Sequence, residues 1–563
     1  MAPQLSPSTS TKDWQSRVAE KRSICQKAIP KAWILTQSLL DTLSAQSELS
    51  KTKTNLISLN IPRHSGILTE RELEITESYN VSSLLEGLAT GRFTSAEVTL
   101  AFSKRAAIAQ QLTNCLTETF FEEAQQRARF LDDSRAQGKL AGPLHGLPVS
   151  LKDTYQVKGT QATIGAVSYL DTTSSENSAL VNMLLDLGAV PYVKTNVSQL
   201  LVGVESDNNI FGRVLNPWNT MLTAGGSSGG EGALIAFRGS VLGVGTDLAG
   251  SIRIPSLCCG TYGFKPSTNR IAYEGQVMPF KEGILPIVPS AGPLANDVET
   301  LQIFMKAVID AKPARYDATA IDVPWRSTNI LPRQSLRLGL LLEDPLFPLH
   351  PPVKEAIAKA AKVLRSYGHE VVLLDAAECH VAEANQIAGG LLSLDTTPRE
   401  IIAAGGEPAL PSMSMLAEQA KSIEWNFVPD LGAMDDLQKL GLLQSQRARL
   451  AEDWRKLWVK HRLDAVISPS AQNTAVEHDT FCWPAYSAFL NLLDYPACVI
   501  PFQQAAKSEL PFVVRPGQGT PLYNPKAVEG APCSIQIFTS RMRDEECLAV
   551  ASIVDECLKD SKN

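Results

Sequence analysis

Short apolar segments typical of β-strands alternate with amphipathic segments typical of helices along most of this chain. This alternation limits the possible folds more than any other feature. Strand-like segments occur at 189–193, 336–342, 371–374, 464–468 and 497–501, and helix-like segments at 180–187, 352–367 and 544–558. Alternation of this kind predicts an α/β fold, in which helices cover both faces of a mixed central β-sheet.

The N-terminal part has a different texture. Residues 1–12 are rich in Pro, Ser and Thr, residues 14–47 suit helices interrupted at Pro30, and residues 48–78 are rich in loop signals. Further along, Thr94 is followed three residues later by Glu97, which has the form of a helix capping box. We therefore predict an N-terminal tail and helical extension over residues 1–75, and one large catalytic domain over residues 76–563.

Composition excludes several classes of function. The formal net charge is −7 and no dense Lys/Arg stripe is present, so we expect no nucleic-acid partner. No run of about 18 apolar residues occurs, so we expect no integral membrane segment. The 10 cysteines are scattered without zinc-type spacing, and the N-terminus lacks signal-peptide features. Together these observations predict reduced thiols in a cytoplasmic protein.

Glycine is unusually dense between Thr223 and Lys265, at positions 225, 226, 229, 230, 232, 239, 243, 245 and 250. Dense glycine indicates positive φ angles or close approach of another group to the backbone. Phosphate binding is disfavoured, because a Walker A motif needs a Lys before a Ser/Thr and none is present here. A dinucleotide GxGxxG motif beginning at Gly243 would need glycine where Leu248 stands.

A serine-hydrolase elbow is a second interpretation of the same segment. Residues 225–229 and 226–230 both match GxSxG, but Asn216-Pro-Trp before them indicates a turn, whereas an elbow follows a strand. Histidines that could complete such a triad follow at 350, 369, 380, 461 and 478. The order of residues alone therefore leaves this interpretation open.

A third interpretation uses two serines and a lysine. A lysine can activate a serine nucleophile if it is uncharged, although a free lysine has a pKa of about 10.4. Burial without a counter-ion can lower that value by up to ~3–5 pH units. Lys152 ends the apolar run 147–151, and Asp153 should point to the opposite face of the strand, so it need not neutralise Lys152.

Three separated blocks support the third interpretation. They read GLPVSLKD at 146–153, GGSSGG at 225–230 and GTDLAGSIRIP at 245–255, with Ser227 and Ser251 24 positions apart. In this order the blocks resemble those of the amidase signature family, and the resemblance extends from about residue 80 to the C-terminus. In its overall sequence pattern the chain looks most like fungal acetamidase-type amidases and fatty acid amide hydrolases. The resemblance implies the amidase signature fold.

The resemblance also implies roles for individual residues. Uncharged Lys152 would deprotonate Ser227, which would relay the proton from the nucleophile Ser251, and the peptide bond between Gly226 and Ser227 would be cis. The oxyanion hole maps to the backbone N–H groups of Leu248, Ala249, Gly250 and Ser251. Supporting positions are Ser228, Thr246, Asp247 and Arg253, with Asp247 orienting loop amides or pairing with Arg253. Candidate substrate-binding residues are Leu201, Val202, Trp483, Tyr486 and Leu490.

The function implied is hydrolysis of a small or lipophilic carboxamide through an acyl-enzyme, without cofactor or metal. Most family members have glycine at the position of Ala249, and the added methyl group would tighten the acyl pocket. The expected partner is a small-molecule amide, and a homodimer is compatible with the sequence. Two alternatives stay open: an inactive binding protein with this fold, and a subunit of an amidotransferase-type complex.

Overall fold

The computed structural model describes residues 13–42, 51–281, 283–330, 335–507 and 512–561. One sheet of 11 strands runs through the described part, in the order β1-β3-β2-β4-β6-β5-β10-β11-β9-β7-β8. The strands are β1 (Leu116–Thr119), β2 (Pro148–Lys152), β3 (Val190–Thr195), β4 (Leu242–Asp247), β5 (Tyr262–Lys265), β6 (Ser290–Ala295), β7 (Arg337–Leu340), β8 (Glu370–Leu373), β9 (Ala465–Ser468), β10 (Ala497–Gln504) and β11 (Pro532–Phe538).

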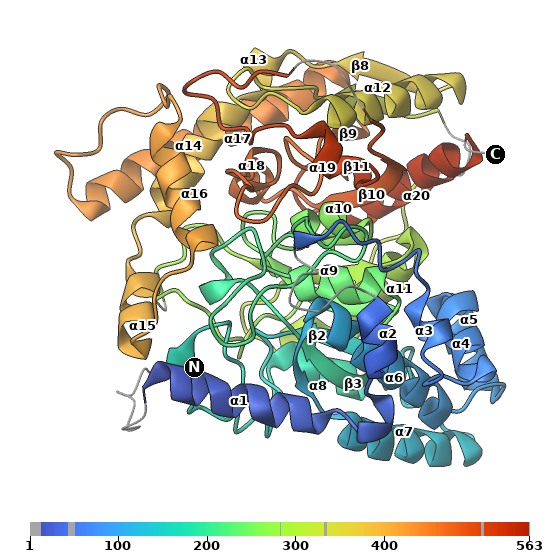
Figure 1. The fold of residues 1–563 in the computed structure, drawn as a ribbon. Coiled ribbons are helices and arrows are strands. Elements are labelled where there is room, and N and C mark those ends of the chain that lie inside the picture. The colour runs from blue at the N-terminus through green and yellow to red at the C-terminus, as the bar shows by residue number, and fades with distance from the viewer. Residues whose placement is uncertain (1–12, 43–50, 282, 331–334, 508–511, 562–563) are drawn as a thin grey trace.

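Helices surround this sheet (Figure 1). Those before the glycine-rich segment are α1 (Trp14–Ala28), α2 (Gln37–Thr42), α3 (Ile61–His64), α4 (Glu70–Ser78), α5 (Val81–Thr90), α6 (Ser95–Thr113), α7 (Phe121–Ala136) and α8 (Ala179–Asp186). Within and after it lie α9 (Gly229–Ala236), α10 (Arg253–Cys259), α11 (Val298–Asp310), α12 (Pro351–Ser366), α13 (Ala376–Cys379) and α14 (Val381–Leu392). The remainder are α15 (Thr397–Gly405), α16 (Pro411–Ser422), α17 (Asp436–His461), α18 (Ala485–Leu493), α19 (Pro525–Val528) and α20 (Asp544–Asp560).

The sheet is mixed, as the alternating patterns predict. Strands β3, β2 and β4 are parallel neighbours, and so are β9, β7 and β8. The other pairings, such as β4 with β6 and β10 with β11, are antiparallel. The predicted α/β fold with helices on both faces is therefore confirmed.

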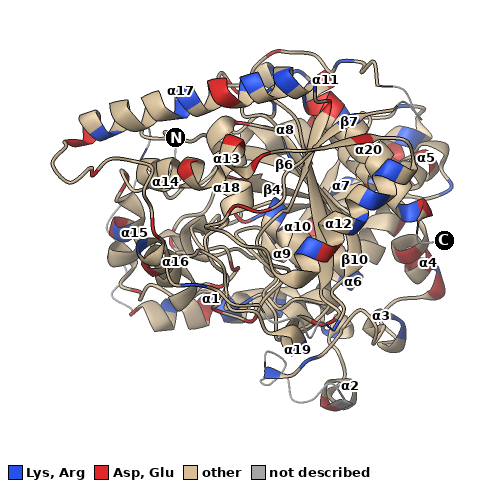
Figure 2. Ribbon diagram, turned by 90° about the horizontal axis from the view of Figure 1, so that it is seen from above, with Lys and Arg blue, Asp and Glu red and all other residues tan. Residues whose placement is uncertain are grey.

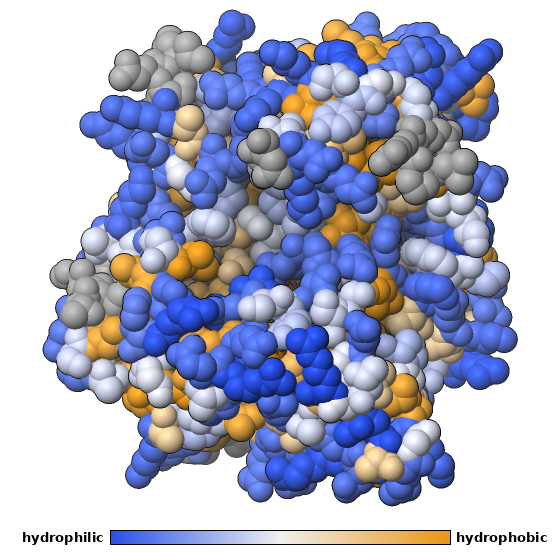
Figure 3. All heavy atoms as spheres, turned by 90° about the vertical axis from the view of Figure 1, so that its right-hand side faces the viewer, coloured by the Kyte–Doolittle hydropathy of each residue, from blue (hydrophilic) through white to orange (hydrophobic). Residues whose placement is uncertain are grey.

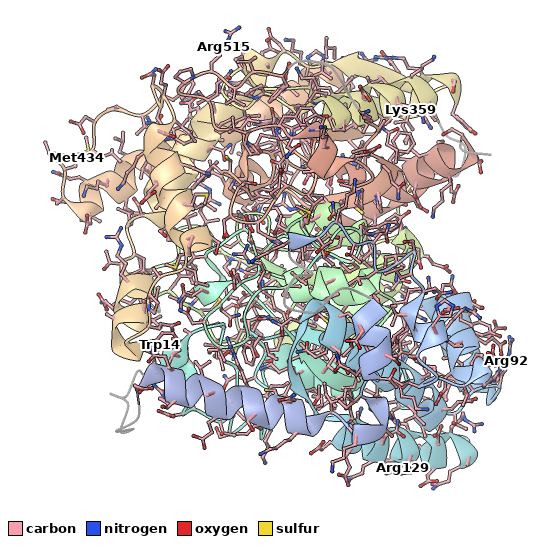
Figure 4. The ribbon with its side chains drawn as sticks, viewed as in Figure 1. Trp14, Arg92, Arg129, Lys359, Met434 and Arg515 are labelled. Atoms are coloured by element: carbon pink, nitrogen blue, oxygen red, sulfur yellow. The ribbon has the colours of Figure 1, made fainter. Side chains whose placement is uncertain are left out.

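The helical extension lies against the main body. Arg17 donates to the carbonyl oxygen of Val167 at 2.9 Å, and Lys21 pairs with Glu118 at 2.6 Å. Figure 4 labels Trp14 at the start of α1, and Met434 at the far left on the loop between α16 and α17. The predicted tail, residues 1–12, lies outside the described residues.

Within residues 48–78, which the sequence predicts to be rich in loops, the helices α3 and α4 form. Thr69 accepts a hydrogen bond from the backbone N–H of Glu72, and the Glu72 side chain accepts one from the backbone of Thr69. This capping box satisfies N–H groups that the first turn of a helix leaves unpaired, so the helix begins there.

Charged residues follow the outer helices, such as α17 and α20, and are sparse in the middle of the molecule (Figure 2). The face shown in Figure 3 is mostly hydrophilic, with hydrophobic residues in small separate groups. Across the described ranges, no helix combines the length and the apolar character needed to cross a lipid bilayer. All 10 cysteines are free thiols.

The central parallel strands position the chemistry. The carboxyl ends of parallel strands meet at one edge of a sheet, where α/β proteins bind ligands. Here β3 ends at Thr195, β2 at Lys152 and β4 at Asp247, and Lys152 is the register partner of Thr195. The glycine-rich loops that precede α9 and follow β4 lie at this edge, because Ser227 of the first loop contacts Lys152 and the second loop continues directly from β4.

Candidate active site

Lys152 is wholly buried at the end of β2. Its Nζ lies within hydrogen-bond distance of Ser227 Oγ at 2.8 Å, Thr246 Oγ1 at 2.9 Å and the Thr246 carbonyl oxygen at 3.2 Å. It makes no ion pair with any carboxylate of the described ranges. Burial lowers the pKa of Lys152 from 10.5 to about 7, against the opposing attraction of Asp247 and Glu231. This lysine can therefore be uncharged at neutral pH.

The neighbouring carboxylate, Asp153, points away from Lys152, as strand alternation predicts. Asp153 forms an ion pair with Lys194 at 3.0 Å and accepts a hydrogen bond from Thr117 Oγ1 at 2.9 Å. Both members of this ion pair are fully buried. The charge of Asp153 is therefore compensated by a different lysine.

The loop that carries Ser227 and Ser228 enters α9. The Gly226–Ser227 peptide bond is cis, as the resemblance implies. A Cβ at Gly226 would lie 2.7 Å from the backbone nitrogen of Glu205, so close approach of two backbones requires glycine there. Ser228 donates its backbone N–H to the carbonyl oxygen of Ser251 at 3.2 Å, which joins the two serine-bearing loops.

Ser251 lies on the loop between β4 and α10 and is half-buried, whereas Ser227 is buried. The Ser251 hydroxyl makes no hydrogen bond within the described part of the chain, and in particular none to the Ser227 hydroxyl. The structure thus brings Lys152 and Ser227 into direct contact and brings Ser251 to Ser228 through the backbone. No described residue hydrogen-bonds to the Ser251 hydroxyl.

A buried ion pair supports the Ser251 loop. Arg253 donates through Nη2 to Asp247 Oδ1 at 2.9 Å and through Nε to Oδ2 at 3.0 Å. Asp247 also accepts the backbone N–H groups of Gly250 at 2.8 Å and Ile252 at 3.1 Å. Burial alone would raise the pKa of Asp247, but the charge and hydrogen bonds of Arg253 hold it well below its usual range. Asp247 therefore both orients loop amides and pairs with Arg253.

Helix α18 and strand β11 hold the other side of this support. Arg253 donates to the Ser487 carbonyl oxygen at 3.0 Å, to Asn491 Oδ1 at 2.5 Å and to Gln536 Oε1 at 3.1 Å. Ser487 Oγ in turn donates to the Ala249 carbonyl oxygen at 3.0 Å. The sequence analysis assigned no supporting role to Ser487, Asn491 or Gln536, because nothing in the local sequence shows that α18 packs on this loop.

The predicted oxyanion donors are not equivalent. The N–H of Gly250 is already donated to Asp247. For the N–H groups of Leu248, Ala249 and Ser251, no hydrogen-bond acceptor is found in the ranges that the structure describes. Three of the four predicted N–H groups, those of Leu248, Ala249 and Ser251, are therefore available for a substrate oxygen.

The predicted substrate-binding residues lie in different surroundings. Leu201 and Val202 are partly buried and pack on a cluster that includes Ile164 and Ile401. Trp483 lines an open depression of about 590 Å³, together with residues of α16 and of the 518–524 segment. Tyr486 is fully buried, donates to the Phe347 carbonyl oxygen at 2.7 Å and accepts the Asp344 N–H at 2.8 Å.

Tyr486 and Leu490, one turn apart on α18, both lie in the interior of the protein with no exposed surface. A role in lining the acyl pocket stays a prediction for both residues. The apolar pattern of α18 could not separate a pocket wall from a core face, since both need apolar residues.

The described residues give little support to a histidine-dependent serine hydrolase, a cysteine nucleophile or a metal site. No described histidine hydrogen-bonds to Ser227, Ser228 or Ser251, which a serine-hydrolase elbow would need. Burial raises the pKa of Cys258 and of Cys259, which disfavours a thiolate nucleophile. No group of three or more His, Cys, Asp or Glu side chains suited to a metal ion occurs among the described residues.

One buried carboxylate beside the site was not predicted. Glu231, in the first turn of α9, is fully buried and accepts hydrogen bonds from Ser150 Oγ at 2.6 Å and Thr195 Oγ1 at 2.9 Å. The sequence offered one signal, an acidic residue directly after a block of glycines and serines, but an acid in the first turn of a helix is common.

Comparisons with known proteins agree with the three sequence blocks. A family model described as Amidase matches residues 97–548. The chain is 37% identical over 552 residues to an amidase of Gibberella moniliformis, covering 97% of this chain and 99% of that protein. It is 36% identical over 569 residues to an acetamidase of Emericella nidulans, covering 97% and 98% of the two chains.

A solved structure is similar along almost the whole chain. A fatty acid amide hydrolase superposes with a TM-score of 0.87 at 29% identity, covering 97% of this chain and 95% of that one. The chain therefore belongs to the amidase signature family, the amide hydrolases that act on carbon–nitrogen bonds other than peptide bonds.

Proposed function

We propose that this protein hydrolyses a small or lipophilic carboxamide to a carboxylate and ammonia or an amine, through an acyl-enzyme on Ser251. The observation that carries the proposal is the buried Lys152 Nζ, which lies 2.8 Å from Ser227 Oγ without a carboxylate partner. A lysine in this state can accept a proton at neutral pH, which an ordinary surface lysine cannot.

In the proposed acylation step, Ser251 Oγ attacks the amide carbon and its proton passes to Ser227. Ser227 passes its own proton to Lys152, and the carbonyl π electrons move to the substrate oxygen. The amide C–N bond then breaks as Lys152 returns a proton through Ser227 to the leaving nitrogen. Water attacks the resulting ester by the same relay and releases the carboxylate.

This relay needs a hydrogen bond between the Ser251 and Ser227 hydroxyls. The Ser251 side chain makes no hydrogen bond in the described ranges, so no described residue holds its hydroxyl away from Ser227. Catalytic hydrogen bonds often tighten only when substrate is bound. The relay therefore predicts that the contact closes on binding.

The oxyanion would be bound by backbone N–H groups of Leu248, Ala249 and Ser251. Asp247 and Arg253 hold this loop from behind, so the donors are fixed before the substrate arrives. Donors that need no reorganisation stabilise charge that develops in the transition state, and each contributes about 3–4 kcal/mol in other acyl-transfer sites.

The proposed substrate class rests on the relatives and on the apolar residues at the predicted pocket positions. The relatives named above carry the words acetamidase and fatty acid amide hydrolase, which span short and long acyl groups. Leu201, Val202 and Trp483 supply apolar surface, which favours a carboxamide without charge on its acyl part. We further propose a cytoplasmic location, in keeping with 10 free thiols.

Two replacements test the proposal against the alternatives. Ser251→Ala and Lys152→Met should each lower turnover of a panel of primary amides of graded chain length by roughly a thousandfold or more. The matched control is Ser366→Ala, an exposed serine at the end of α12, which should leave turnover unchanged. Near-normal turnover by Ser251→Ala would reject the mechanism.

A fluorophosphonate probe separates the remaining interpretations. Label mapped to Ser251 supports the proposal, whereas label mapped to Ser228 would favour the elbow. An unlabelled, folded wild type would indicate an inactive binding protein. Turnover that appears only after addition of partner subunits would indicate an amidotransferase-type subunit.

A further inference from the structure

Glu231 is a buried carboxylate that the proposed relay does not use. No part of its side chain is exposed, and within the described ranges it makes no ion pair with a Lys or Arg. It is held instead by two hydroxyl donors, Ser150 Oγ at 2.6 Å and Thr195 Oγ1 at 2.9 Å. Burying a carboxylate without a cation partner lowers the stability of the fold, unless the carboxylate is protonated or interacts with a nearby charge.

Its position is tied to that of Lys152. Ser150 and Lys152 are two residues apart on β2 and so share one face of the sheet, while Thr195 is the register partner of Lys152 on β3. The two donors to Glu231 are thus the neighbour of Lys152 along its own strand and its neighbour on the adjacent strand. Glu231 therefore packs on the face from which the lysine side chain rises.

The third strand of this face makes room for the carboxylate. Gly243 on β4 is the register partner of Ser150. A Cβ at Gly243 would lie 1.9 Å from Glu231 Oε2, so even alanine would displace the carboxylate. Three parallel strands thus form the binding position of the Glu231 carboxylate, which we call its seat. Ser150 and Thr195 supply hydroxyl donors, and Gly243 leaves the space that a side chain would fill.

Among the described residues, Lys152 is the cation that acts on Glu231. The other ionisable groups that face Glu231 are Cys115, Tyr155 and Tyr192. Burial raises the pKa of each, so all three are neutral at physiological pH. The other carboxylate that faces Lys152, Asp247, is already paired with Arg253.

Building on the proposed function, we propose that Glu231 is a positioning residue that sets the charge state of Lys152. When Glu231 is ionised it attracts a proton to the lysine, and when it is protonated that attraction vanishes. Burial raises the pKa of Glu231 to about 7, close to that of Lys152. The two groups consequently titrate as a coupled pair over the range in which the relay must work.

The pH dependence of kcat/KM tests this inference. In Glu231→Gln the lysine loses the attraction that favours its charged form, so it should stay neutral to lower pH. The midpoint of the acid limb should therefore move down by roughly half a pH unit or more. The matched control is Glu205→Gln, which neutralises another fully buried carboxylate, one that no interaction links to Lys152, and should leave the midpoint in place.

A folded Glu231→Gln enzyme whose midpoint does not move would overturn the inference, as would an equal shift in Glu205→Gln. If Glu231→Gln fails to fold, Ser150→Ala replaces it. Loss of that hydroxyl donor disfavours the ionised carboxylate, so the midpoint should move in the same direction by less, and an unmoved midpoint again counts against the inference.

Stability supplies a readout that needs no turnover and so separates this inference from the proposed mechanism. Because the folded pKa of Glu231 lies above its ordinary value of 4.5, wild-type stability should fall relative to Glu231→Gln as the pH rises from 5 to 8. In a Lys152→Met background, where no amine attracts the carboxylate, this fall should be larger. Equal falls in the two backgrounds would show that the groups do not interact.

Discussion

Replacement of Lys152 by methionine should make the protein more stable while it abolishes activity. Keeping this amine uncharged in the fold costs about 5 kcal/mol at pH 7, because burial lowers its pKa from 10.5 to about 7 and each tenfold change costs about 1.4 kcal/mol. Methionine fills a similar volume and has no charge to lose. The stability gained by the replacement is therefore set by how far the pKa of the lysine is lowered in the fold.

The opposing term is the loss of three hydrogen bonds, to Ser227 Oγ, Thr246 Oγ1 and the Thr246 carbonyl oxygen. At about 1 kcal/mol each, they contribute about 3 kcal/mol to stability. The net expectation is a gain of about 2 kcal/mol for Lys152→Met at pH 7. The gain should be measured as the difference in free energy of unfolding by denaturant titration.

The pH dependence of that gain identifies its cause. Between pH 7 and 10.5 the unfolded chain holds the lysine proton and the folded protein does not, so wild-type stability rises with pH. The advantage of Lys152→Met should shrink by about 1.4 kcal/mol per pH unit over this interval and change sign at about pH 8.5. An advantage that does not vary with pH, or a variant less stable than wild type by several kcal/mol at pH 7, would refute the reasoning.

Lys194→Met is the matched control. Lys194 is equally buried but paired with Asp153 at 3.0 Å, so its loss leaves an uncompensated buried carboxylate. This variant should be destabilised by about 3–5 kcal/mol. The same substitution at two fully buried lysines of adjacent strands should thus act with opposite sign.

Three further outcomes are expected. Because the pKa of Lys152 is about 7 and its uncharged form is the active one, kcat/KM should fall about tenfold per pH unit below pH 7, as initial rates in overlapping buffers would show; a flat profile down to pH 5 would contradict this. Asp247→Asn should lower stability by about 3–5 kcal/mol in denaturant titration, since it leaves buried Arg253 without a counter-charge, and a stability equal to that of wild type would count against the support assigned to this pair. Gly250→Ala should lower kcat, because Gly250 has a φ of 129° and a Cβ there would lie 2.3 Å from Ser487 Oγ; Gly368→Ala, at a φ of 87° with no atom within 4 Å, is its control and should keep the kcat of wild type.

Local sequence was sufficient to predict about half of the strands of the sheet. The strand expected at 464–468 is β9 (Ala465–Ser468), and the helix expected at 352–367 is α12 (Pro351–Ser366). Hydrophobic periodicity and turn residues act within about 15 residues, so a single sequence contains that information. The order of the strands depends on contacts between distant segments, such as β5 beside β10, which no local pattern encodes.

For the site, too, sequence predicted the contacts within and between the motifs but not the contacts made by residues outside them. The contact of Lys152 with Ser227 and the pairing of Asp247 with Arg253 follow from the family blocks and from strand alternation. The use of the Gly250 N–H by Asp247, the core position of Tyr486 and the seat of Glu231 could not be predicted in this way. Each depends on which residue packs against which across the fold, and apolar or glycine-rich segments are compatible with several such arrangements.

The buried charges of the site show why Lys152 is the amine that can act as a base. Three lysines are fully buried in the described ranges, Lys152, Lys194 and Lys265. Lys194 pairs with Asp153 at 3.0 Å and Lys265 lies 3.9 Å from Asp494, whereas Lys152 has only neutral hydrogen-bond partners. A carboxylate in contact would hold the lysine in its charged form. Asp153 is paired with Lys194, Asp247 is bound to Arg253, and Glu231 is held by Ser150 and Thr195. None of these three carboxylates forms an ion pair with Lys152, so burial can lower the pKa of the lysine.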